Sequence, residues 1–114
     1  MKFPLEQLRL WMTENPPRLR DIMSAVCWVR HADPSELFMR KNTDARNLFF
    51  YVATEFGKFP TSELAEMGNT SIEDTARYVY NIGVKLERHR EEPLLDDLML
   101  ITVMLAESVL ARGR

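Results

Sequence analysis

The sequence predicts an all-α fold, a single compact domain built from several helices. Apolar residues recur at spacings of three and four along most of the chain, which is the period of an amphipathic helix. Prolines and single glycines interrupt this period at points where helices have to end. The chain has 114 residues, enough for one hydrophobic core without a metal or a disulfide. We therefore expect several helices packed around one core.

The N-terminal third of the chain predicts two helices. Residues 5–12 have the spacing of a short amphipathic helix, which Asn15-Pro16-Pro17 stops. We therefore treat residues 1–17 as an N-terminal helical arm, and residues 18–114 as the domain itself. Residues 18–31 carry the next periodic apolar set and predict the first core helix.

Two further helices are predicted before the middle of the chain. Asp33 is expected to cap a short helix, which leads into a polar, basic connector at residues 40–43. Asp44 is then expected to cap a helix over residues 45–56, and Gly57 terminates it. Its inward stripe is expected to hold Leu48, Phe49, Val52, Ala53 and Phe56, and we interpret its aromatic content as core and not as a stacking platform.

The next stretch has the punctuation of a helix-turn-helix. Thr61 or Ser62 is expected to cap a short helix, and Gly68 is expected to end that helix in the left-handed conformation. Ser71 begins a second helix and can form a capping box with Asp74; Thr70 and Glu73 offer the same pairing one residue earlier. This is the arrangement of a DNA-binding helix-turn-helix, although other pairs of helices joined by a tight turn have the same punctuation.

The second helix of this motif is predicted to continue to about Arg90. Its buried face is expected to hold Ile72, Ala76, Val79, Ile82 or Gly83, and Leu86. Its outer face is expected to present Glu73, Asp74, Arg77, Tyr78, Asn81, Lys85 and Arg88. The arginine, amide and hydroxyl groups on that face suit base edges or phosphates.

The last predicted helix, Leu94 to about Ala111, carries more apolar residues than one face can hold. We expect Leu94, Leu98, Ile101 and Leu105 to form its buried stripe. The excess predicts a homodimer through Leu94–Leu110, which would present two copies of the motif. The alternative is that the N-terminal arm folds back onto this helix in the same chain.

Composition and charge limit the classes of protein to consider. Hydrophobic residues make up 46% of the chain and charged residues 28%, which is ordinary for a globular protein. The single cysteine, Cys27, is interpreted as a small core residue in a reducing compartment. The net charge of -2 means that any affinity for nucleic acid has to come from a local patch.

Several function classes are not expected. No apolar run approaches the roughly 20 residues of a membrane span, and no signal segment opens the chain, so we expect a cytoplasmic protein without a membrane partner. The glycines stand singly, which excludes a Gly-rich phosphate loop and a nucleotide. The histidines and the acidic pairs are explained by helix ends and solvated faces, so we expect no catalytic residue, no metal, no cofactor and no enzyme.

The order of the elements resembles the C-terminal DNA-binding domain of the bacterial replication initiator DnaA. The resemblance covers about Leu19 to Leu105 and rests on the order helix, short helix, helix, helix-turn-helix, terminal helix. It also rests on Arg46, which precedes an aliphatic-aromatic helix containing the family's Tyr-x-Ala-x-Glu pattern at residues 51–55. It implies a fold of the TrpR/DnaA-like helix-turn-helix type, in which Arg46 enters the minor groove and the second helix of the motif reads the major groove.

One stretch departs from the family. Members carry a Gly-Gly-Arg-Asp-His-Thr-Thr-type run where this chain has residues 69–75, so the basic and histidine groups are missing and Glu73 and Asp74 are added. Only Thr75 matches the threonines of that run. The ATPase part of the initiator is also absent from this sequence.

Two functions follow from this reasoning. The first is a small bacterial DNA-binding regulator of replication or transcription, associated with the nucleoid, whose partner is double-stranded DNA. The second is a protein-interaction module that kept the fold and acts through its apolar C-terminal helix. The residues predicted to bind DNA are Arg40, Lys41, Arg46, Ser71, Thr75, Arg77, Tyr78 and Asn81.

Overall fold

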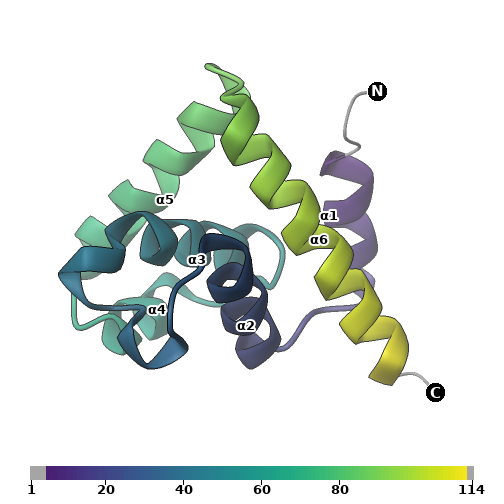
Figure 1. The fold of residues 1–114 in the computed structure, drawn as a ribbon, viewed down its shortest axis with the longest axis horizontal. Coiled ribbons are helices and arrows are strands. Elements are labelled where there is room, and N and C mark those ends of the chain that lie inside the picture. Colours follow the sequence, from purple (N-terminus) through teal and green to yellow (C-terminus); the bar gives the residue numbers. More distant parts are fainter. Residues whose placement is uncertain (1–4, 113–114) are drawn as a thin grey trace.

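The computed structural model describes residues 5–112, without the side chains of residues 5, 6, 8 and 9, and within this range all regular structure is helical (Figure 1). The predicted all-α fold is confirmed. The apolar side chains of Leu5 and Leu8, on which the predicted arm partly rests, lie outside the described residues. The elements in chain order are α1 (Leu5–Glu14), α2 (Leu19–Arg30), η1 (Pro34–Glu36), η2 (Arg40–Asn42), α3 (Thr43–Glu55), α4 (Thr61–Met67), α5 (Ile72–Glu87) and α6 (Glu92–Arg112).

Helix α3 is the centre of the core. It packs against α2 and α5, while α6 packs on α2 and α4 packs on α5 (Figure 1). Every residue from Leu48 to Ala53 is buried, so α3 is covered on more sides than the single inward stripe predicted from the sequence. A stretch of helix that is buried on every side needs neighbours on several sides, and α2 and α5 are the main ones.

Two of the predicted helix caps are confirmed and two are wrong. The backbone N–H of Ser35 donates to Asp33 Oδ1 at 2.9 Å, and that of Asp74 donates to Ser71 Oγ at 3.0 Å. Asp44 does not cap α3, because η2 continues directly into α3 and leaves Asp44 inside the first helical turn. Neither Thr61 nor Ser62 caps α4, which begins at Thr61 after Pro60 without a side-chain capping bond.

Gly68 corrects a second expectation, because its φ is -85° and the left-handed residue of this turn is Asn69, with φ of 52°. The glycine is needed for space instead. A Cβ at this position would lie 2.7 Å from Cζ of Phe50, a fully buried ring of α3. The close approach of the turn to α3 therefore explains why residue 68 is a glycine. The left-handed conformation expected from the sequence is not the reason.

The N-terminal helix and the last helix complete the core. Met12 of α1 is fully buried, and Nη2 of Arg112 in α6 donates at 2.7 Å to the carbonyl oxygen of Pro16, two residues after α1 ends. Of the predicted buried stripe of α6, Leu98, Ile101 and Leu105 are buried and Leu94 is half-buried. Among the described residues, no helix has the length and apolarity that a membrane crossing requires.

Candidate nucleic-acid interface

The turn between α4 and α5 is tightly bonded. The backbone N–H of Gly68 donates to Leu64 O at 3.0 Å, and that of Thr70 donates to Ala65 O at 3.0 Å. Ser71 then caps α5. These bonds satisfy carbonyls and amides that the two helix ends would otherwise leave open. The direction in which α5 leaves α4 is therefore set by local hydrogen bonds as well as by packing.

Arg46, the strongest single residue in the sequence-based prediction, lies between α3 and α5. Its Nε and Nη2 donate to Asn47 Oδ1 at 3.1 and 2.9 Å, and its guanidinium carbon is 4.4 Å from the ring centre of Tyr78. These contacts leave the Arg46 side chain half-buried. A cation over an aromatic face at this distance is attracted by the ring quadrupole.

The ring of Tyr78 contacts Phe50 and both arginines of this site. Its ring stacks on Phe50 of the core, with centres 6.5 Å apart and planes 6° apart. Tyr78 is therefore half-buried against α3, which corrects the expectation that it stands on the outer face of α5. Arg77 approaches the same ring at 5.8 Å and pairs with Asp74 Oδ1 through Nη2 at 2.8 Å. Two arginines from different helices thus lie over one tyrosine.

The buried face of α5 is rotated from the predicted one. Thr75 is fully buried, while Ile72 and Ala76, both expected inside, are exposed. The hydroxyl of Thr75 donates to the carbonyl oxygen of Ser71 at 2.8 Å, so it is satisfied within the helix and can enter the core. The predicted DNA contact by Thr75 has to be corrected for this reason, since its side chain faces no solvent. Ser71 is exposed, but its hydroxyl oxygen serves as the cap.

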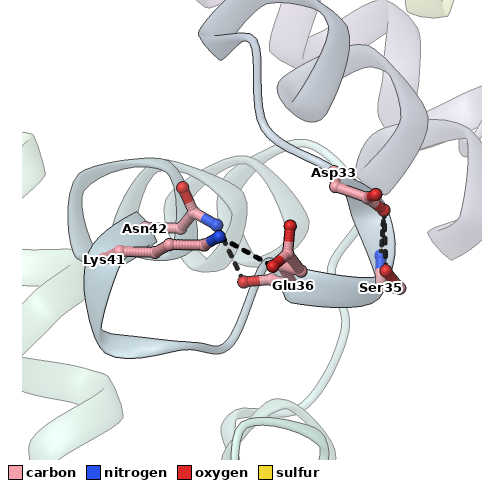
Figure 2. Close-up of polar contacts among 5 residues, drawn as sticks. All are labelled: Asp33, Ser35, Glu36, Lys41 and Asn42. Carbon is pink, nitrogen blue, oxygen red and sulfur yellow. Dashed lines mark hydrogen bonds and ion pairs between the residues drawn. The ribbon is translucent and has the colours of Figure 1, made fainter.

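The basic segment before α3 folds around Glu36 (Figure 2). Nζ of Lys41 lies 2.7 Å from Glu36 Oε2, and Nδ2 of Asn42 donates to the carbonyl oxygen of Glu36 at 2.8 Å. Arg40 is exposed on the same turn, and its carbonyl oxygen accepts a bond from Thr43 Oγ1 at 2.7 Å. The segment predicted as an open connector is therefore an ordered 3-10 turn that leads directly into α3.

An open groove of about 590 Å³ separates the start of α3 from the second half of α5. Asn81, a predicted site residue, is exposed on α5 and lines this groove. Three polar residues that were not among the predicted site residues join it: Asn47, Lys85 and His89. Asp44 and Glu91 also line the groove, so its walls carry both signs of charge. Helical spacing gave no signal for Asn47 or His89, since only the packing of α3 on α5 brings them together.

Nucleophilic or metal chemistry has little support in the described part of the chain. Cys27 is buried, as predicted, and burial, followed by the nearby charge of Asp33, raises the pKa of its thiol. A raised pKa disfavours the reactive thiolate. Among the described residues, no cluster of three or more His, Cys, Asp or Glu side chains is arranged to hold a metal ion.

Comparison with known proteins gives no match to this chain, whether with protein-family models, with curated proteins or with solved structures. Its function is therefore inferred from the residues and the geometry described above.

Proposed function

We propose that the chain is a small regulator that binds double-stranded DNA through a TrpR/DnaA-like helix-turn-helix formed by α4 and α5. One observation carries the proposal: Arg46 of α3 and Arg77 of α5 lie over the same Tyr78 ring, at 4.4 and 5.8 Å from its centre. Two guanidinium groups at one point of the surface supply the local cationic patch that a chain of net charge -2 needs. We call Arg46, Arg77 and Asn81 the arginine patch.

The residues of the arginine patch suit different parts of a duplex. Arg77 and Asn81 are both exposed and stand one helical turn apart on α5, where a guanidinium and an amide can meet base edges or phosphates. Arg40 and Lys41, exposed before α3, suit phosphates. The ion pair of Lys41 with Glu36 and that of Arg77 with Asp74 are solvent-accessible, so exchanging the carboxylate for a phosphate costs little.

The acidic first turn of α5 shapes the proposed contact. Glu73 is exposed there, and Asp74 is half-buried beside Arg77. Both carboxylates repel phosphate. We therefore propose that the middle of α5, from Arg77 to Asn81, faces the duplex, and that the first turn stands away from the sugar-phosphate backbone.

The proposal is tested by fluorescence anisotropy with a labelled duplex of about 20 base pairs of mixed sequence at about 50 mM salt. Arg77→Glu should weaken binding at least about tenfold, because it reverses a charge in the patch. Arg20→Glu makes the same change at an exposed position of α2 and is the matched control. Equal losses in the two variants, or no binding by the unmodified chain, would refute the proposal.

Salt dependence gives a second measurement of the same proposal. If three or four of the four cations named above reach phosphates, log affinity should fall against log salt with a slope of roughly -3 to -4. Arg77→Ala should reduce the magnitude of this slope by about one. A slope near zero would show that the complex does not depend on phosphate contacts.

A second candidate function is supported by a different observation. Helix α6 exposes apolar side chains on the face that points away from the core, namely Met99, Leu100, Val103 and Leu110. Contiguous exposed apolar side chains of this kind mark protein-interaction surfaces. A protein-interaction module would use this face, whether or not α5 binds DNA.

A further inference from the structure

The outward face of α6 has a regular pattern. Met99, Leu100, Val103 and Leu110, which we call the α6 stripe, are 38, 51, 51 and 56% exposed. Their spacings of three, four and seven put them on one side of the helix, opposite the buried residues Leu98, Ile101 and Leu105. The stripe is thus a second, largely apolar face of α6, which the described part of the chain leaves exposed.

The charged residues of α6 that share the side of the stripe are all acidic. Glu92, Asp96 and Glu107 are exposed, and their spacing from the stripe residues puts them on the same side of the helix. The only basic residue of α6 is Arg112, and its guanidinium is turned to the carbonyl oxygen of Pro16. A surface that covers the stripe therefore meets three carboxylates of α6 interleaved with the apolar residues. One described cation of a neighbouring helix, Arg30 of α2, is already paired with Asp97 of α6 at 2.8 Å.

We propose that the α6 stripe binds an amphipathic helix of a partner protein whose apolar face is flanked by lysine or arginine. This proposal rests on the protein-interaction function and is independent of DNA binding. The stripe and its three carboxylates run from Glu92 to Leu110, about 27 Å at 1.5 Å per residue, the length of a helix of five turns. Met99 lies at an edge of the stripe, where its flexible side chain can adapt to the partner.

The same carboxylates disfavour a homodimer in which two copies of the α6 stripe cover each other. A parallel pair of α6 helices aligns each carboxylate with itself. An antiparallel pair that crosses at Val103 places Glu107 of one copy against Met99 of the other. The Glu107 carboxylate would then be desolvated against a thioether, which cannot replace its hydrogen bonds to water. Neither arrangement supplies the cation that a desolvated carboxylate requires. A cationic helix supplies it in both directions.

The test uses the full chain and two synthetic helical peptides of about 18 residues, long enough to form a helix on contact. Both carry leucine at the same helical spacing, with lysine at the remaining positions of one peptide and glutamate in the other. Fluorescence anisotropy should show the leucine-lysine peptide binding at least about tenfold more tightly than the leucine-glutamate peptide. Equal binding of the two peptides would overturn the role of charge.

Variants locate the peptide on the chain. Val103→Lys should weaken the leucine-lysine peptide at least about tenfold, because it puts a like charge at the centre of the stripe. Leu10→Lys makes a comparable change at a residue of α1 that is 69% exposed, and should leave binding unchanged. Unchanged melting temperatures check that both variants fold. Equal losses in the two variants would overturn the assignment to the α6 stripe.

Sedimentation of the chain alone at tens of micromolar tests whether a second copy of the chain covers the stripe instead. The proposal expects a monomer. A dimer that Val103→Lys dissociates would show that a second copy covers the stripe, and would overturn the proposal. Duplex binding by Val103→Lys, measured in parallel, should equal that of the unmodified chain. A chain that binds the peptide but no duplex would refute the DNA proposal and leave this one supported.

Discussion

Gly68 ends α4 where the turn into α5 passes over the core, and replacing it by alanine measures how closely that turn is packed. The backbone angles of Gly68, φ -85° and ψ 0°, are open to alanine, so the substitution adds no backbone strain. The added Cβ, however, would lie 2.7 Å from Cζ of Phe50, where ordinary contact begins at 3.4 Å. The turn and the ring must therefore separate by about 0.7 Å, the difference between these two distances.

The Phe50 ring has little room to withdraw. It is fully buried, and its centre lies 6.1, 5.9 and 6.5 Å from the ring centres of Phe38, Phe49 and Tyr78. Overpacking of this kind costs about 1–3 kcal/mol, and the lower chain entropy of alanine in the unfolded state returns about 0.4–1 kcal/mol. Gly68→Ala should therefore destabilise the protein by roughly 0.5–2 kcal/mol. That corresponds to a fall in melting temperature of several degrees.

Gly83→Ala is the matched control, because it makes the same change inside α5. Its Cβ would lie 3.7 Å from Cε2 of Tyr51, which is ordinary contact, so the variant should gain about 0.5–1 kcal/mol of stability. Urea unfolding followed by circular dichroism measures both variants. In a Phe50→Leu background, which lacks Cζ, the cost of Gly68→Ala should largely disappear. A Gly68→Ala protein as stable as Gly83→Ala, or a cost unchanged by Phe50→Leu, would refute this account of the turn.

Three further predictions follow from the site. Arg46→Ala should weaken duplex binding by about 1–3 kcal/mol and also lower stability by about 1 kcal/mol, since its contact with Tyr78 is lost; anisotropy and thermal unfolding of the same sample separate the two effects. Thr75→Val should cost about 0.5–1.5 kcal/mol of stability without changing duplex affinity, and a loss of affinity would restore Thr75 as a contact. The hydrogen bonds from the Ser35 side chain and backbone hold the pKa of Asp33 below its ordinary value, so the stability that Asp33 adds relative to Asp33→Asn should be present above pH about 4 and be lost as pH falls further; a constant difference in urea titrations down to acid pH would contradict this.

Local interactions made much of the helical framework readable from the sequence. The all-α class, the caps at Asp33 and Ser71 and the buried stripe of α6 depend on residues within a few positions of one another. Apolar spacing also predicted the excess on α6. These features need no knowledge of which helix packs against which, and that is why the sequence alone determined them.

Only the tertiary structure decided which face of α5 is buried and that Arg46 lies half-buried over Tyr78. Helical spacing predicted Ile72 and Ala76 as inward positions of α5 and left Thr75 as a DNA contact. Packing on α3 turns Thr75 inward, because its hydroxyl is satisfied by Ser71, and it brings Tyr78 against the core and under Arg46. Gly68 likewise owes its identity to a ring that is distant in the sequence. Contacts between helices choose among faces that are nearly equal in local energy, and those contacts exist only once the chain has folded.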